Sequence, residues 1–201
     1  MQSGKKIFQS FSIVLFLIII SAGVTYSYFT ALNNSGSTSM VNLISGNMIL
    51  SFGDNNPSLL FSDVIPGPTD STEDAVLDKE FTITGVTNNS GLNMKYKLLF
   101  NISVNEFSND SLGYILVGNN SSSGSLVNSA YTSFNSNNIT RLNKLSSPTS
   151  IDLGTGYFTS NISNVTHTYH LYMFFIETGG LQDDAGASFV GNVEIQATDN
   201  L

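Results

Sequence analysis

The chain starts with a continuous apolar run and then changes to short alternating patterns of apolar and polar residues. Residues 11–24 read FSIVLFLIIISAGV and follow Lys5 and Lys6. Further along, no long segment repeats with the 3.6-residue period of an amphipathic helix. Apolar residues instead alternate with polar ones over short runs, which is the pattern of half-buried strands. The pattern predicts an N-terminal signal helix followed by an all-β domain.

Eight short segments carry this alternation and are expected to be strands, of which the first two, 40–44 and 48–52, form either two strands or one strand with a bulge. They are 40–44, 48–52, 81–86, 94–102, 114–117, 151–158, 168–176 and 189–197. We expect 81–86 and 94–102 to pair across the turn sequence NNSG at 88–91. Residues 103–150 are expected to hold loops, with either a short helix or a further loop around 104–107.

This number of short strands, separated by polar turns, favours a jelly-roll-like antiparallel β-sandwich. The inner faces of two such sheets pack against each other. The 14 Phe and 8 Tyr residues are expected to supply much of that core. The predicted organisation is a signal peptide at 1–27, an N-terminal donor-strand or linker segment at 28–43 and a sandwich domain at 44–201.

Residues 1–27 have the three parts of a secretory signal: a basic start, an apolar centre and an end with small residues. The apolar centre is shorter than the roughly 20 residues that a membrane-spanning helix needs. Cleavage is predicted between Ser27 and Tyr28, and the Ser-Ala-Gly sequence at 21–23 offers a second position. An uncleaved membrane anchor is the alternative. In both cases the rest of the chain is expected outside the cytoplasm, with membrane contact only through the signal segment.

Composition excludes several classes of function. The chain has 7 Lys+Arg, 15 Asp+Glu and no Cys in 201 residues. Without residues 1–27, which hold Lys5 and Lys6 but no acidic residue, five basic and 15 acidic residues remain, a net charge of −10. Such an acidic chain is not expected to bind nucleic acid, because phosphates require clusters of basic residues. The lack of Cys excludes disulfides, thiolate metal sites and a cysteine nucleophile.

The residues that could carry chemistry form no specific motif. His167 and His170 are expected on opposite faces of one strand, because side chains alternate with a period of two. The acidic residues between 54 and 80, and the pair Asp183 and Asp184, could bind a cation but match no calcium-loop pattern. No Gly-x-Ser-x-Gly sequence is present. We therefore predict no catalytic residue, no metal ligand and no cofactor.

The order of short motifs is more informative than any one of them. The sequence TYSYFT at 25–30 is followed by LISGNMILS at 43–51, VIPG at 64–67, FTI at 81–83 with NNSG at 88–91, HTY at 167–169 and ASF at 187–189. This ordered set resembles the TasA/camelysin family of exported bacterial matrix-fibre proteins. The resemblance covers most of the chain and is weakest over residues 103–150.

The resemblance implies a secreted or cell-surface structural subunit that polymerises into biofilm fibres, after cleavage by a signal peptidase of the SipW type. The partners implied are other copies of the chain and accessory matrix proteins. In such fibres the mature N-terminal segment of one subunit adds a strand to its neighbour. Here the expected anchors of that donor strand are Phe29, Leu32, Met40 and Val41. The alternative is that this segment folds onto its own sheet or stays disordered.

Two other functions remain as alternatives to the fibre subunit. The first is a monomeric cell-surface module that binds glycan or protein, with Tyr131, Tyr157 or Tyr172 stacking on sugars. The absence of Trp, the strongest stacking residue, weighs against it. The second is a hydrolase or protease. The camelysin name refers to proteolysis, but the chain has no metal-ligand motif to carry that activity, so we predict that it is not an enzyme.

Overall fold

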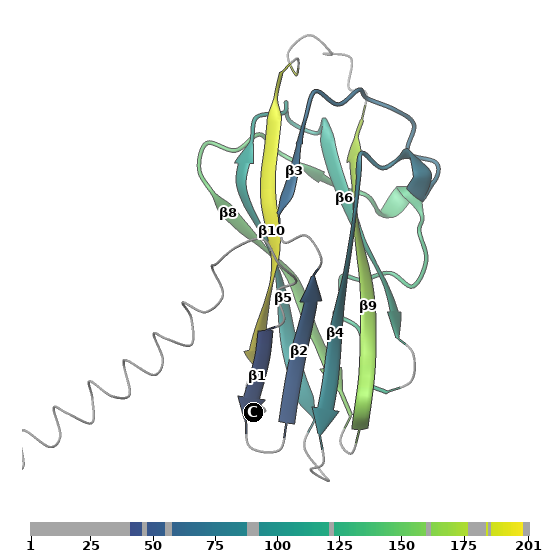
Figure 1. The fold of residues 1–201 in the computed structure, drawn as a ribbon. Coiled ribbons are helices and arrows are strands. Elements are labelled where there is room, and N and C mark those ends of the chain that lie inside the picture. Colours follow the sequence, from purple (N-terminus) through teal and green to yellow (C-terminus); the bar gives the residue numbers. More distant parts are fainter. Residues whose placement is uncertain are drawn as a thin grey trace, which may run out of the picture. The chain divides into compact units, whose positions relative to one another are not determined.

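The computed structural model describes residues 41–45, 48–54, 58–87, 93–120, 123–159, 162–176, 184 and 186–198. They all belong to one compact unit, Ser37–Leu201. In these residues ten strands form two antiparallel sheets, which pack face to face as a sandwich (Figure 1). The predicted all-β sandwich is confirmed, and the predicted signal helix lies outside the described residues.

The two sheets differ in size. The larger sheet contains, in spatial order, β1 (Val41–Ser45), β2 (Met48–Asp54), β4 (Leu77–Thr87), β9 (Ile162–Phe175), β6 (Leu112–Asn120) and β7 (Thr140–Leu142). The smaller sheet contains β3 (Leu59–Ser62), β10 (Ser188–Thr198), β5 (Met94–Asn105) and β8 (Thr149–Phe158). Two short 3₁₀ turns, at Thr72–Asp74 and Ser136–Asn138, lie in the connections.

The last eight strands have the nested pairing of a jelly roll. β3 pairs with β10, β4 with β9, β5 with β8 and β6 with β7. The hairpin of β1 and β2 is an addition to these eight strands, and it pairs with the outer edge of β4. The expected jelly roll is therefore confirmed, while the expected start of the domain at residue 44 falls inside β1.

Each of the eight predicted segments coincides with a strand over its described residues, except that β9 ends one residue early, at Phe175; several strands are longer than the alternation indicated. β3 and β7 were not predicted, and β5 continues to Asn105 where a short helix was one expectation. The expected pairing of β4 with β5 is wrong. β4 pairs with β2 and β9, whereas β5 pairs with β10 and β8 in the other sheet. In a jelly roll the chain crosses between the sheets after most strands, so neighbours in sequence need not pair.

The core between the sheets is largely aromatic. Along β5 buried and partly exposed residues alternate, so one face of the strand points into the sandwich. The largest fully buried side chains of this core are Tyr96, Tyr169, Phe81, Phe100, Phe107, Phe158 and Phe189, while Phe174 is buried in a second, smaller cluster with Ile115 and Ile176. Several pack ring against ring, such as Phe81 on Tyr169 with centroids 5.3 Å apart. Phe and Tyr supply this core as predicted.

Candidate functional site

The two lateral sides of the sandwich are built differently, and they are the candidate functional region. We call the side with β7, β8 and residues 123–131 the sealed side. We call the side with the hairpin of β1 and β2, the short strand β3 and the neighbouring length of β10 the open side (Figure 1). An exposed strand edge presents unpaired N–H and C=O groups that can pair with another chain. The treatment of each edge therefore decides what the protein can bind.

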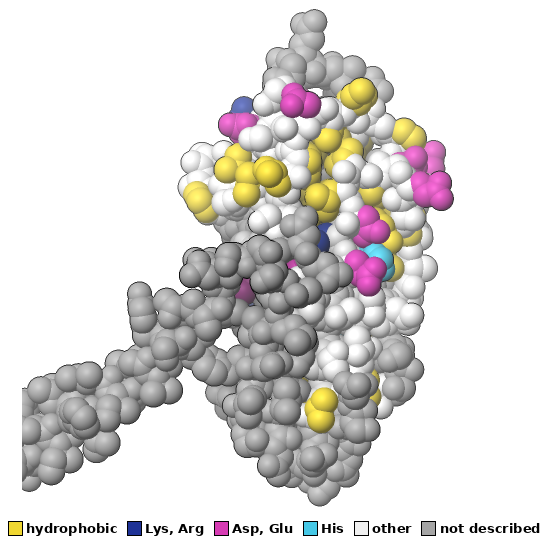
Figure 2. All heavy atoms as spheres, in the orientation of Figure 1, with side chains coloured by type: hydrophobic (Ala, Val, Ile, Leu, Met, Phe, Trp, Pro, Cys, Tyr) yellow, Lys and Arg dark blue, Asp and Glu magenta, His cyan; other side chains and the backbone are white. Residues whose placement is uncertain are grey.

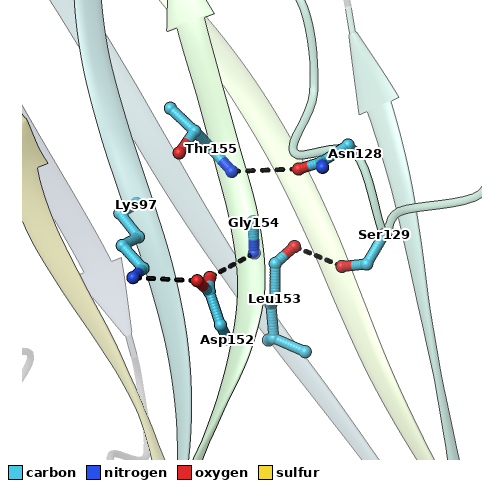
Figure 3. Close-up of polar contacts among 7 residues, drawn as sticks. All are labelled: Lys97, Asn128, Ser129, Asp152, Leu153, Gly154 and Thr155. Carbon is cyan, nitrogen blue, oxygen red and sulfur yellow. Dashed lines mark hydrogen bonds and ion pairs between the residues drawn. The ribbon is translucent and has the colours of Figure 1, made fainter.

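On the sealed side, residues 123–131 run along the outer edge of β8. Ser125 and Tyr157 exchange two backbone hydrogen bonds, of 2.8 and 2.9 Å. The Asn128 carboxamide accepts a hydrogen bond from the Thr155 N–H at 3.1 Å, and the Ser129 hydroxyl donates to the Leu153 carbonyl (Figure 3). These contacts occupy edge groups of β8 with groups from the same chain.

The same segment is fixed to the larger sheet as well. The Tyr131 N–H donates to the Leu116 carbonyl at 2.9 Å, and the Gly118 N–H donates to the Tyr131 carbonyl at 2.8 Å. Val127 is buried and packs in the main core. Residues 123–131 therefore tie β8 of one sheet to β6 of the other across the sealed side.

A bulge and a charge pair add to the protection of β8. The register between β5 and β8 shifts next to Leu98, and Gly154 has φ of +97°. The Asp152 carboxylate accepts a hydrogen bond from the Gly154 N–H and pairs with the Lys97 ammonium, both at 2.8 Å (Figure 3). The Lys97 ammonium and that N–H hold the pKa of Asp152 below its usual value. Bulges and charges are common devices against edge pairing.

The open side leaves a length of β10 paired on one side only. β3 pairs with residues 188–191 of β10, whereas β5 pairs with β10 along nearly its whole length. No strand among the residues that the structure describes pairs with residues 192–198 on the edge that faces away from β5. This edge continues the line of β3 (Figure 1), and a strand edge without a partner is the surface that strand addition uses.

Two large apolar side chains are exposed on β3 and in the loop after it. Leu60, which pairs with Val190 of β10, is 65% exposed, and Ile65, in the loop that leaves β3 at the end away from residues 192–198, is 83% exposed. Figure 2 shows apolar side chains on the surface in the upper part of this face, where β3 and β10 run. Single exposed apolar residues are ordinary on protein surfaces, and of these two only Leu60 lies close to the length of β10 that has one partner strand among the described residues.

Most of the predicted donor segment lies outside the described residues. This holds for Ser27, Tyr28, Phe29, Leu32 and Met40. Val41 is described: it opens β1 and is paired with Phe52 of β2. The structure thus places the last predicted anchor in the chain's own edge hairpin, immediately after the remainder of the segment.

A polar network is buried between the sheets where β5 faces β9. The Tyr96 hydroxyl lies 2.5 Å from Nδ1 of His167 and 2.6 Å from the Tyr169 hydroxyl. The Tyr169 hydroxyl also accepts a hydrogen bond from the Val127 N–H at 3.1 Å. Burial lowers the pKa of His167 to about 4 and raises the pKa of both tyrosines. His167 is therefore neutral at pH 7, and the Tyr169 hydroxyl joins residues 123–131 to this buried network.

The histidine and acidic residues that were considered as cation ligands make other contacts in the structure. As expected, His167 is buried while His170 lies on the outer face, with its Nδ1 2.9 Å from Asp78. Asp74 accepts hydrogen bonds from the N–H groups of residues 70 and 71, and Asp184 accepts one from the Ser108 N–H at 2.5 Å. Among the described residues, which do not include Asp183, no three acidic or histidine side chains form a group able to hold a metal ion.

The aromatic residues considered for sugar binding are dispersed. Tyr131 and Tyr157 are 42% and 36% exposed, and both belong to the backbone pairing of the sealed side. Tyr172 lies on β9 and stacks on His170, with centroids 5.6 Å apart. Among the described residues, the rings of these three tyrosines do not pack against one another, so they do not form a single stacking platform there.

A scan against protein-family models and a search of the curated proteins find no match to this chain. In the part of the chain that the structure describes, no helix has the length and apolar character needed to cross a membrane.

Proposed function

We propose that this protein is an exported structural subunit that assembles with copies of itself into extracellular fibres. In each contact, the segment before β1 of one subunit would add a strand to the open side of the next. The observation that carries the proposal is the asymmetry of the sandwich: residues 153–157 of β8 are covered by the chain itself, whereas residues 192–198 of β10 have a partner strand on one side only among the described residues. The ordered sequence motifs of the TasA/camelysin type support the same function.

The contact would be between two different surfaces, a donor segment and an acceptor edge. Such a head-to-tail interface does not close on itself unless the rotation between subunits allows a ring, and it otherwise generates a filament. The sealed side prevents a second, competing strand addition at β8. One donor and one acceptor per subunit would then give an unbranched polymer.

Burial of apolar side chains alone would hold two subunits together only weakly, so the contact also needs strand pairing. Burying four large apolar side chains stabilises a contact by roughly 6–12 kcal/mol. Association costs about 4–15 kcal/mol, so the apolar term leaves a small balance. The backbone hydrogen bonds of an added strand supply the remainder and set its register. An acceptor edge with free backbone groups is therefore the necessary element, and apolar anchors such as Phe29 and Leu32 supply specificity.

The test compares two forms of the protein. Purified residues 28–201 are expected to form fibres or strand-exchanged oligomers, visible by electron microscopy and as an early peak in size-exclusion chromatography. Residues 41–201 keep all ten described strands but lack the donor, and they are expected to stay monomeric. Monomers from both forms over a range of pH and salt, or fibres from both, would contradict the proposal.

A further inference from the structure

The chain buries one Lys–Asp pair in the interior of the sandwich. The Lys79 ammonium contacts the Asp54 carboxylate, and the two side chains are 6% and 0% exposed. Asp54 is paired with Phe81 across β2 and β4, and Lys79 lies two residues from Phe81 on the same face of β4. This diagonal spacing is within reach of a long side chain, so the register of the two strands holds amine and carboxyl in contact.

The surroundings of this pair are apolar. Phe52 and Phe81 lie next to Asp54 and Lys79 along the inward faces of their strands, with ring centroids 5.7 Å apart. Both rings are buried, and Phe81 stacks on Tyr169 of β9. Removing an ion pair from water into such surroundings costs several kcal/mol per ion. Transfer of the ammonium proton to the carboxylate removes both charges and leaves an amine beside a carboxylic acid.

A second Lys–Asp pair in the same chain shows the contrast. Lys97 and Asp152 are 2.8 Å apart on the outer face of the smaller sheet, where their side chains are 32% and 57% exposed. Water reaches both of these charged groups, so neither is held in a dry interior. The two pairs have the same chemistry and differ in burial, which makes the exposed pair an internal control.

We propose that Lys79 and Asp54 condense to an intramolecular isopeptide bond. The Lys79 amine attacks Cγ of the Asp54 carboxylic acid, the new C–N bond forms and the C–OH bond breaks. One amine hydrogen leaves with that hydroxyl as water, and the product is a neutral amide. No oxidant or other reactant is needed. The reaction converts a buried ion pair into a group that needs no charge compensation.

The fold supplies the two conditions that the reaction requires. Holding the reacting groups in contact replaces an encounter in solution, and such proximity is worth effective concentrations of about 10⁵–10⁸ M when the geometry is right. Exclusion of water from the site favours amide formation over hydrolysis. The bond would close the loop between residues 54 and 79, which contains β3, and fasten the added hairpin to β4. A chain with no Cys would gain a covalent staple by this route.

The intact mass of the purified, folded chain tests the bond directly and does not depend on whether the protein forms fibres. The expected mass is lower than that of the sequence by one water. Digestion of the denatured protein after Glu separates the two residues, because the first Glu is Glu73 and the next is Glu80. Residues 74–80 are then expected to remain joined to the peptide that contains Asp54.

Two variants and one control complete the experiment. Lys79→Arg keeps the positive charge but lacks the amine, so its mass is expected to equal that of its sequence. Asp54→Asn can still condense, and its mass is expected to be lower by one ammonia instead of one water. The peptides with Lys97 and Asp152 are expected to be unlinked throughout. A wild-type chain of full sequence mass, or a lost water that maps away from Asp54 and Lys79, would overturn the proposal.

Discussion

The sealed and open sides of the sandwich solve the same problem of an exposed strand edge in opposite ways. On the sealed side, residues 123–131 supply backbone and side-chain partners to β8 and reach across to β6. On the open side, β3 is four residues long and leaves residues 192–198 of β10 with one partner strand in the described part of the chain. Protection of one edge only is what a one-directional polymer needs.

The two Lys–Asp pairs follow the same division. Lys97 and Asp152 lie beside the sealed edge and are partly solvated, whereas Lys79 and Asp54 are buried beside the added hairpin of the open side. The comparison teaches that contact distance does not set the importance of an ion pair. Burial sets how much an ion pair contributes to stability, because a buried charge that loses its partner cannot regain contact with water.

The largest effect is expected when each lysine is removed. Lys79→Ala leaves the Asp54 carboxyl buried without its amine, and should lower the free energy of unfolding by about 3–5 kcal/mol. Lys97→Ala removes an exposed pair and should cost less than about 1 kcal/mol. Urea unfolding followed by circular dichroism measures both. Equal losses of unfolding free energy in the two variants would contradict the proposed difference between the buried and the exposed pair.

The next largest effect on stability is expected in residues 123–131, the segment that covers the edge of β8. Gly124 has φ of +112°, and a Cβ there would lie 1.9 Å from the Tyr157 carbonyl oxygen. Gly124→Ala should therefore lower stability by about 2–4 kcal/mol, from backbone strain and a clash with β8. Gly186 also has a positive φ, of +77°, but a Cβ there meets nothing within 4 Å. Its Ala variant should cost about 1 kcal/mol.

Hydrogen exchange distinguishes a local from a global response in these glycine variants. Gly124→Ala is expected to speed exchange of the β8 amides on the sealed edge more than that of the β4 amides. Uniform acceleration over all strands would show that residues 123–131 do not act as a separate cover of β8.

A smaller loss of stability is expected when the pH is lowered. The unfolded chain protonates His167 near pH 6.5, but the folded protein does so only near pH 4, because burial lowers the pKa. The unfolded state therefore binds more protons between these values, and stability falls as pH falls through this window. From pH 6.5 to pH 5 the loss should be about 2 kcal/mol. Thermal unfolding of His167→Gln should lack this share of the pH dependence, and an unchanged slope would contradict it.

The smallest effect on stability is expected from charges at the two edges. Leu60→Lys on β3 and Thr155→Lys on β8 both change exposed side chains, so each should alter stability by no more than about 0.5 kcal/mol. Their effects on assembly should differ. A lysine beside the open edge should slow fibre growth of residues 28–201, followed by light scattering, while the β8 variant should grow like the wild type. Equal growth of both variants would argue against the open edge as acceptor.

The sequence predicted the fold well because period-two alternation marks long half-buried strands. β3 and β7 escaped prediction because they are only four and three residues long, too short for a pattern to form. Pairing was predicted less well. The turn at 88–91 suggested a hairpin, yet β4 and β5 belong to different sheets, and no local signal distinguishes a turn within a sheet from a crossing between sheets.

The candidate site could not be predicted in the same way. Both the sealing of β8 and the one-sided pairing of β10 depend on contacts between segments far apart in the chain. Asp54 was grouped with the acidic residues between 54 and 80, and only the register of β2 with β4 shows that it meets Lys79 inside the core. The alternation of Phe52 with Asp54, and of Lys79 with Phe81, was the available signal, since charged residues at inward positions need a buried partner.

Addition of the donor segment as a separate peptide tests the central claim most directly. Residues 41–201 are mixed with a peptide of residues 28–40, and amide hydrogen exchange is followed along the sandwich. The account predicts saturable binding with new protection at residues 192–198 of β10 and unchanged exchange in β8. Protection that appears on β8 instead, or a peptide that does not bind at all, would contradict it.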